Sequence, residues 1–217
     1  MRAILVLLVG AIALAAPETE SKLTEPDESR PANVAVDVRW APIQFSNYSF
    51  APGSRTIRPG NAVLLSLEWL PFHHYGKAGI GAGAGFFVQP NQDLKDGRTA
   101  TLSAFPLDIH ASYYFDYLEN QLIVPYASVG ASWVFLQQSS PNGASIPGTQ
   151  SYQGWEYSFG GEICLTPIDR NSAHSLRRLL GIERTYLTVS YQRSQPLNRG
   201  VPDLSYDVYR LGFRVEI

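Results

Sequence analysis

Apolar side chains alternate with small or polar ones, with a period of two, in eight segments between Val34 and Ile217. A period of two places alternate side chains on opposite faces of a β-strand. The first segment sets Val34, Val36, Val38 and Trp40 against Ala35, Asp37 and Arg39. The eight expected strands are 34–40, 63–69, 79–88, 107–116, 126–135, 155–165, 187–191 and 209–217. Most are longer than the about 5 to 6 residues usual in globular proteins, so an all-β fold of long strands is expected.

The two faces of these strands differ in chemistry. One face is mostly Gly, Ser and Ala with isolated charges, and between Gly79 and Gly85 every second residue is glycine. The other face is aliphatic and is flanked by aromatic residues, namely Trp40, Trp69, Phe72, Tyr113, Phe115, Trp133, Phe135, Trp155 and Tyr191. A soluble lipocalin-like barrel would instead cover its outside with Lys and Glu, yet only 17% of the residues are charged, against about 25% on average. We therefore expect an eight-stranded antiparallel transmembrane β-barrel with a narrow lumen of small residues.

The connections predict which end of the barrel is which. Four segments rich in Pro, Gly, Asn and Ser are expected to be external loops, namely 45–60, 89–99, 137–151 and 195–203. The turns at 73–77 and 119–121 are tight, as periplasmic turns are. The third turn, 167–184, predicts one short amphipathic periplasmic helix, with Asn171 as its N-cap and Gly181 as its stop. This helix could lie on the inner leaflet with Arg177 and Arg178 towards lipid phosphates, or plug the lower rim of the barrel.

The N-terminal region predicts export. Residues 1–15 combine Arg2, an apolar run and small residues at Ala13 and Ala15, which indicates a signal peptide. Residues 16–32 are rich in Pro, Glu, Ser and Thr and are expected to form a disordered periplasmic leader. The barrel is expected to occupy 33–217, where basic and acidic residues are equal in number, so no nucleic-acid footprint is present.

The last strand supports this assignment. Arg210, Gly212, Val215 and Ile217 are similar to the C-terminal signal that the outer-membrane assembly machinery reads, with Ile217 where that pattern has Phe. Together with the export segment and the strand pattern, the chain resembles the small outer-membrane barrels of the OmpA and OmpX type. The resemblance implies an outer-membrane location in a Gram-negative bacterium. Its partners would be the barrel assembly machinery, outer-membrane lipids and lipopolysaccharide, and the barrel would be a monomer.

Charged residues on the inner face predict ion pairs. Seven acids and three arginines point inward, namely Asp37, Glu68, Asp108, Asp116, Glu156, Glu162, Glu216, Arg39, Arg210 and Arg214. A lumen of eight strands is just wide enough for side chains to fill, and unpaired buried charge is costly. Neighbouring strands make Arg39 with Glu68, and Arg214 with Asp37, the expected pairs. The interpretation is a closed lumen and a structural or loop-mediated binding role; a channel for small solutes is the alternative.

One row of the inner face could carry chemistry. Asp108, His110 and Ser112 supply an acid, a base and a hydroxyl, the groups of an acyl-transfer triad. The His-x-Ser spacing is similar to that of the outer-membrane lipid A deacylases, but Tyr113 and Tyr114 follow here in place of Asn-x-Gly. Residues two apart on a strand are almost 7 Å apart, which favours a structural network over an enzyme. No metal site or cofactor is expected, because the adjacent His73 and His74 point in opposite directions.

Overall fold

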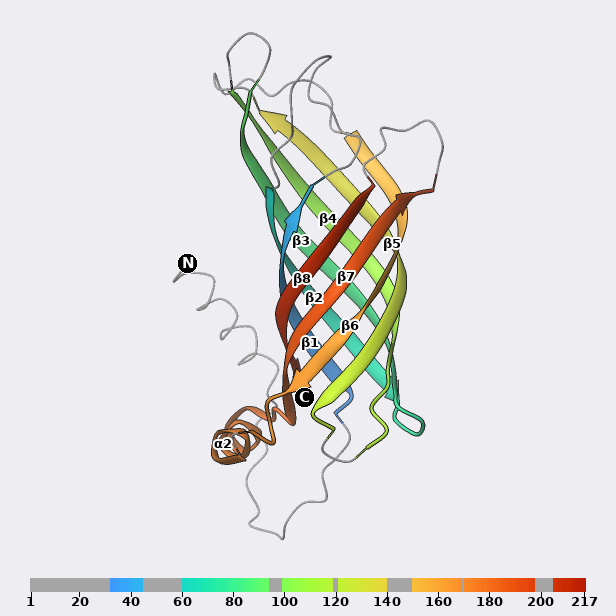
Figure 1. Cartoon of the computed structure of the whole chain (residues 1–217), viewed down its shortest axis with the longest axis vertical. Helices are drawn as coiled ribbons and strands as arrows, with labels where there is room; N and C mark the ends of the chain where they lie inside the picture. The colour runs from blue at the N-terminus through green and yellow to red at the C-terminus, as the bar shows by residue number, and fades with distance from the viewer. Residues whose placement is uncertain are drawn as a thin grey trace.

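The computed structural model describes residues 32–44, 60–93, 99–118, 121–139, 150–168, 170–197 and 205–217. Its elements, in chain order, are β1 (Val34–Ile43), β2 (Gly60–Phe72), β3 (Lys77–Asp93), β4 (Thr99–Tyr114), β5 (Ile123–Ser139), β6 (Gln150–Cys164), α2 (Arg170–Leu180), β7 (Arg184–Pro196) and β8 (Tyr206–Glu216). Each strand pairs with the next in antiparallel fashion, and β8 pairs back with β1 to close a barrel (Figure 1). The expected eight-stranded antiparallel barrel is confirmed. Within the described ranges, no helix has the length and apolarity needed to cross a membrane.

Several strands are longer than their sequence pattern suggested. β3 continues to Asp93 and β4 begins at Thr99, so most of the expected loop 89–99 is strand. The expected short seventh strand is also wrong, because β7 has 13 residues, as many as β2. At the end of β7, Gln192, Arg193, Ser194 and Gln195 are polar on both faces. The period of two therefore disappears from the sequence while the backbone ladder continues.

The N-terminal predictions fall largely outside the described part of the chain. The expected signal peptide, 1–15, and residues 16–31 of the expected leader lie outside it. Ala32, the last residue of that leader, is buried, and its carbonyl accepts a hydrogen bond from His73 Nε2 at 2.8 Å. Asn33 is already part of the sheet, because its carbonyl accepts from the Leu70 backbone N–H at 2.7 Å.

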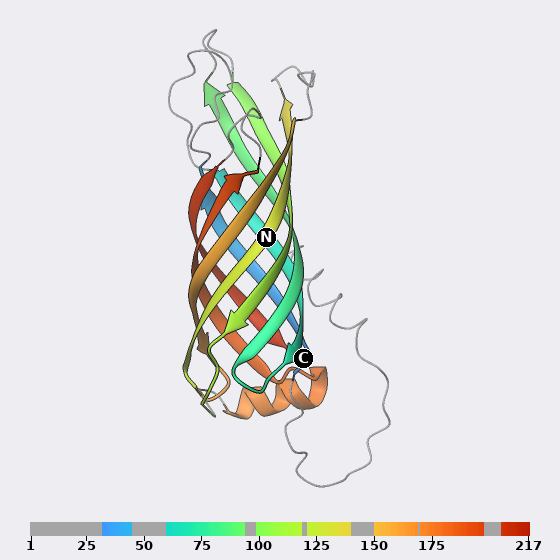
Figure 2. The same cartoon turned by 90° about the vertical axis from the view of Figure 1, so that its right-hand side faces the viewer.

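Side chains alternate between the inside and the outside of the barrel as the sequence predicted. Along β1, Ala35, Asp37 and Arg39 are buried in the lumen while Trp40 is exposed on the outside. We call the end of the barrel that carries the β2–β3, β4–β5 and β6–β7 connections the lower end (Figures 1 and 2). Val34 and Ile217 also lie at the lower end, where their backbones are hydrogen bonded to each other.

The helix α2 lies at the lower end, outside the ring of strands. It is seen along its axis in Figure 1 and from the side in Figure 2, so it runs across the direction of the barrel axis. Asn171 lies inside the helix, which begins at Arg170, so the N-cap prediction is wrong. Gly181 ends the helix as predicted: its φ is 68°, and its N–H donates to Arg177 O at 3.0 Å. Leu179 is 78% exposed, so the helix does not plug the rim.

Candidate functional site

A cluster of charged side chains fills the lower half of the lumen, centred on Arg214 of β8. The guanidinium of Arg214 is completely buried; its Nη1 lies 2.6 Å from Glu68 Oε2 and 3.3 Å from Asp37 Oδ2. Tyr114 completes this arrangement, since its hydroxyl donates to Glu68 Oε2 at 2.7 Å and its ring lies under Arg214, 4.1 Å from ring centroid to Cζ. The carboxylates of Glu162 and Glu216 lie 3.8 and 3.7 Å from the same guanidinium. One cation therefore holds four acids from β1, β2, β6 and β8 together.

Arg39 supplies a second cation to this cluster. Its Nη2 lies 3.0 Å from Asp37 Oδ1, so Asp37 lies between Arg39 and Arg214. The structure brings Arg214 and Asp37 together as the sequence suggested, and they are direct cross-strand partners. The expected pair of Arg39 with Glu68 does not form. The register places Arg39 opposite Leu64 and Glu68 opposite Ala35, four residues apart along the strands, or about 13 Å.

A second cluster closes the lower rim of the lumen. Lys77 Nζ lies 2.7 Å from Glu216 Oε2 and 3.0 Å from Asp116 Oδ2. Arg184 Nη1 lies 2.8 Å from the same oxygen of Asp116, and the Tyr186 hydroxyl accepts from Lys77 Nζ at 3.3 Å. Glu216 belongs to both clusters, so the ion pairs run without interruption from the rim to the middle of the barrel.

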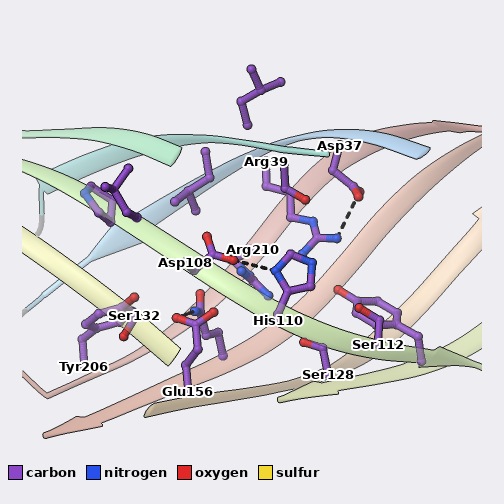
Figure 3. A pocket seen from close by; sticks show the side chains of 17 residues that line it. Asp37, Arg39, Asp108, His110, Ser112, Ser128, Ser132, Glu156, Tyr206 and Arg210 are labelled. Carbon is purple, nitrogen blue, oxygen red and sulfur yellow. Dashed lines mark hydrogen bonds and ion pairs between the residues drawn. The ribbon is translucent and has the colours of Figure 1, made fainter. Parts of the chain in front are cut away.

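The row of Asp108, His110 and Ser112 lines the lumen together with Asp37 and Arg39 (Figure 3). His110 Nδ1 and Asp108 Oδ1 are 2.6 Å apart, so the acid and the base of the hypothetical triad do meet. No hydrogen bond joins His110 to Ser112, both of which lie in the described strand β4, and the Ser112 hydroxyl instead interacts with Glu68. The acid–base pair therefore lacks its nucleophile.

The glycine row of β3 makes space for these side chains. A Cβ on Gly81 would lie 2.6 Å from His110 Nε2, and a Cβ on Gly79 or Gly83 would overlap the carboxylate of Glu68 or Asp108. The inward-facing glycines therefore reflect close packing, because the polar side chains of β2 and β4 lean over the backbone of β3.

Two further pairs complete the upper polar part of the lumen. Gln192 Nε2 donates to Glu156 Oε2 at 2.6 Å, and Arg210 Nε donates to Ser190 Oγ at 3.3 Å. A pocket lined by Asp37, Arg39, Asp108, His110, Glu156 and Arg210, among others, has a free volume of about 20 Å³, which suffices for a single water molecule. Among the described side chains, no group of three or more potential ligands is arranged to hold a metal ion.

Apolar side chains fill the lumen towards the upper end. This apolar plug consists of Ala41, Ile43, Ala62, Phe87, Leu102, Ala104, Val134, Leu136, Tyr152, Tyr206 and Val208, with Leu64 packed against it. The expectation of small residues with isolated charges on the inner face is therefore correct only for the lower and middle barrel. Towards the upper end the inner face is mostly apolar, with the buried polar residues Gln89 and Ser194 beside Leu102 and Tyr206 of the plug.

The outside of the barrel carries a continuous apolar band. On six strands, the outward-facing residues change from apolar to polar towards the upper end of the barrel. The changes lie between Val63 and Asn61, Phe105 and Ser103, Phe135 and Gln137, Trp155 and Gln153, Tyr191 and Arg193, and Tyr209 and Asp207. Along β4 the apolar row extends down from Phe105 to Phe115. With about 3.4 Å per residue and a strand tilt of about 40°, this row is about 25 Å high.

Aromatic residues gather at the two edges of this band. Exposed aromatic residues at the upper edge are Trp40, Phe86, Phe105, Phe135, Trp155 and Tyr209, and those at the lower edge are Trp69, Phe72, Tyr75, Phe115 and Tyr117. Leu65, Leu67, Ile80, Ile109, Val129 and Leu211 lie between them and are also exposed. The two aromatic girdles expected from the sequence are thus present on the structure.

Comparison with known proteins places this geometry in context. No protein-family model matches the chain, and no curated protein does. Among solved structures, the outer membrane protein OprG from Pseudomonas aeruginosa matches 86% of this chain and 96% of its own, at 12% identity and a TM-score of 0.52. The chain has the OprG fold. Ail, the attachment invasion locus protein of Yersinia pestis, matches 86% of this chain and 97% of its own, at 11% identity and a TM-score of 0.48.

The OprG-like fold confirms the architectural resemblance to small outer-membrane barrels. Within this fold, the residues of the expected assembly signal lie on the closing strand: Arg210 and Gly212 face the lumen, and Val215 faces outward. Ile217 follows β8 and its backbone pairs with Val34, so the signal residues take part in barrel closure. Their recognition by the assembly machinery stays a prediction.

The sequence interpretation of this OprG-like barrel missed the rim cluster. Lys77 was assigned to a turn and Arg184 to the end of the helical connection. Both nevertheless obey the period of two, because Lys77 shares a face with Gly79 and Arg184 shares a face with Tyr186 and Thr188. Extending the third expected strand by two residues, to Lys77, and the seventh by three, to Arg184, places both cations on the inner face.

Proposed function

We propose that this protein is a non-enzymatic outer-membrane barrel of a Gram-negative bacterium, closed to solutes, that has a structural role or binds partners through its external loops. The filled lumen is the observation that carries this proposal. Ion pairs occupy its lower part and apolar side chains its upper part, and the pocket lined by Arg39, Asp108 and His110 has a free volume of about 20 Å³, which holds no solute larger than water.

The outer surface supports placement in a membrane. An exposed apolar band of about 25 Å with aromatic edges is what transmembrane barrels present to lipid. In water the same surface would be a large exposed apolar patch of the kind that drives aggregation. Since closure leaves no free strand edge, we propose that the barrel is a monomer surrounded by outer-membrane lipids and lipopolysaccharide, inserted by the barrel assembly machinery.

The enzymatic alternative receives no support from the lumen. The Asp108–His110 pair lacks a serine partner and faces the interior of a filled barrel, where a lipid acyl chain cannot reach it. An acyl hydrolase needs its nucleophile, base and substrate in contact. The pair is therefore proposed to be structural.

A matched pair of substitutions on β2 tests the membrane placement. Leu67 is an outward residue in the middle of the band, and Asn61 is an outward residue above it. In a membrane, L67R should lower the free energy of unfolding by about 2–4 kcal/mol and N61R by about 1 kcal/mol or less. In a soluble protein both sites face water and the two variants would be equivalent. Membrane fractionation and heat-modifiable gel migration of the wild type provide the independent check.

Protease treatment of intact cells tests the orientation. Three of the four upper connections contain trypsin sites, at Arg55, Lys95, Arg98 and Arg199. We expect trypsin to cut there from outside the cell, while Arg177 and Arg178 of α2 are cut only after the outer membrane is permeabilised. The reverse pattern would show that the upper end faces the periplasm.

Conductance in planar bilayers tests the closed lumen. We expect no steady single-channel current from the wild-type barrel under conditions in which an open general porin, added as a control, conducts. A large, steady, nonselective conductance would establish the channel alternative and contradict the proposal.

A further inference from the structure

We propose that α2 is a membrane-surface helix whose leucines insert into the leaflet at the lower end of the barrel, where its arginines meet anionic phospholipid headgroups. The inference rests on the membrane placement proposed above and assigns to the helix a ligand, the lipid surface itself.

The helix has two distinct faces. At 100° per residue, Ala173, Leu176, Leu179 and Leu180 fall within one arc of about 120°. His174 and Arg178 fall on the opposite side. Leu179 and Leu180 are 78% and 41% exposed, although both belong to the apolar arc. The barrel therefore covers only part of this face, and its most apolar edge is open.

The helix lies beside the lower end of β8. Its last residue is followed by Gly181, Ile182 and Glu183, and the Glu183 N–H donates to Glu216 O of β8 at 2.8 Å. Figures 1 and 2 both place α2 beside the C-terminal end of the chain, with its axis across the barrel axis. A helix in this orientation lies parallel to the plane of a membrane that surrounds the barrel. Ile168, which lies just before the helix, is also an exposed apolar residue at this end.

The positive charge of α2 favours an anionic lipid surface as the partner of this helix. The helix sequence contains no acidic residue, and its last turn carries Arg177 and Arg178. Arg177 is bound to Glu183 at 2.5 Å, which joins the helix end to the barrel connection, while Arg178 is exposed on the polar face. Basic amphipathic helices bind anionic membrane surfaces.

Site-directed spin labelling in nanodiscs tests the inference on the full barrel. In a C164S background, one nitroxide is placed at L179C on the apolar face, at H174C on the opposite face, or at V129C in the middle of the barrel band. Heat-modifiable migration verifies that each variant folds. The measured quantity is the accessibility of the label to oxygen, which concentrates in lipid, relative to a water-soluble nickel complex.

We expect the oxygen-to-nickel ratio at L179C to be several-fold higher than at H174C and to approach that at V129C. Replacing a zwitterionic bilayer with one containing anionic phosphatidylglycerol should raise the ratio at L179C and slow tryptic cleavage at Arg178 several-fold. Equal ratios at L179C and H174C, with V129C in lipid, would overturn the inference and leave the proposed function intact. A label at V129C exposed to water would overturn both. Shielding of L179C only in discs that hold two barrels would also overturn it, because a second copy would then be the occupant.

Discussion

Arg214 Nη1 and Glu68 Oε2 lie 2.6 Å apart at the centre of the barrel, and neither side chain reaches the surface. They come from strands that are not neighbours, since β8 and β2 are separated by β1. This contact therefore links two strands over the inner face of β1. Asp37 of β1 forms an ion pair with the same Nη1 atom of Arg214.

Removal of this cation should destabilise the barrel strongly. R214M leaves Glu68 buried without its counter-charge and leaves Asp37 with Arg39 alone, and we expect the free energy of unfolding to fall by about 3–5 kcal/mol. Urea unfolding in phospholipid vesicles, followed by tryptophan fluorescence, measures the change. R193M is the control: Arg193 lies 3.5 Å from Asp207 on the outside, where both are about half exposed, and the expected loss is about 1 kcal/mol or less. Equal losses in the two variants would mean that the buried cluster contributes no more than a surface pair.

The space left by the glycine row should be needed for folding. G81A places a methyl group 2.6 Å from His110 Nε2 and 2.9 Å from the Leu67 carbonyl, so we expect a loss of about 1–3 kcal/mol. Gly161 is the matched control, because nothing lies within 4 Å of the Cβ it would gain. G161A should be neutral or stabilise by up to about 1 kcal/mol, through the entropy of the unfolded chain. The same unfolding assay compares the two variants. A G81A variant as stable as the wild type would show that the side chains around Gly81 are packed less tightly than in the structure.

Substitutions at two adjacent phenylalanines test the packing of the apolar plug. Phe87 is 1% exposed inside the barrel and Phe86 is 48% exposed outside it. F87A should leave a cavity in the plug and cost about 3–5 kcal/mol. F86A should cost less than about 2 kcal/mol, because lipid chains can fill the space it vacates. If F86A is the more damaging of the two, the upper lumen is not packed as an apolar core.

Ser112 should be dispensable for any chemistry on lipid. Because His110 is bound to Asp108 and not to Ser112, S112A should leave the acyl chains of lipid A unchanged. Mass spectrometry of lipid A from cells that express the wild type, S112A or no protein provides the measurement. An acyl chain that is lost with the wild type but retained with S112A would re-establish the hydrolase.

The sequence by itself determined the number of strands, the face to which each side chain points and the position of the helix in the third connection. Alternation carries this information because the pleat sends residues i and i+1 to opposite faces in any register. The glycines of β3, the arginines of the lumen and Gly181 at the end of α2 could all be placed from local pattern alone.

Only the tertiary structure decided which inward residues meet. Face is a local property, but height along the barrel depends on how each strand is shifted against its neighbours when the sheet closes. That shift separates Arg39 from Glu68, brings Glu68 past β1 to Arg214, and gathers Phe87, Leu102 and Leu136 into one plug.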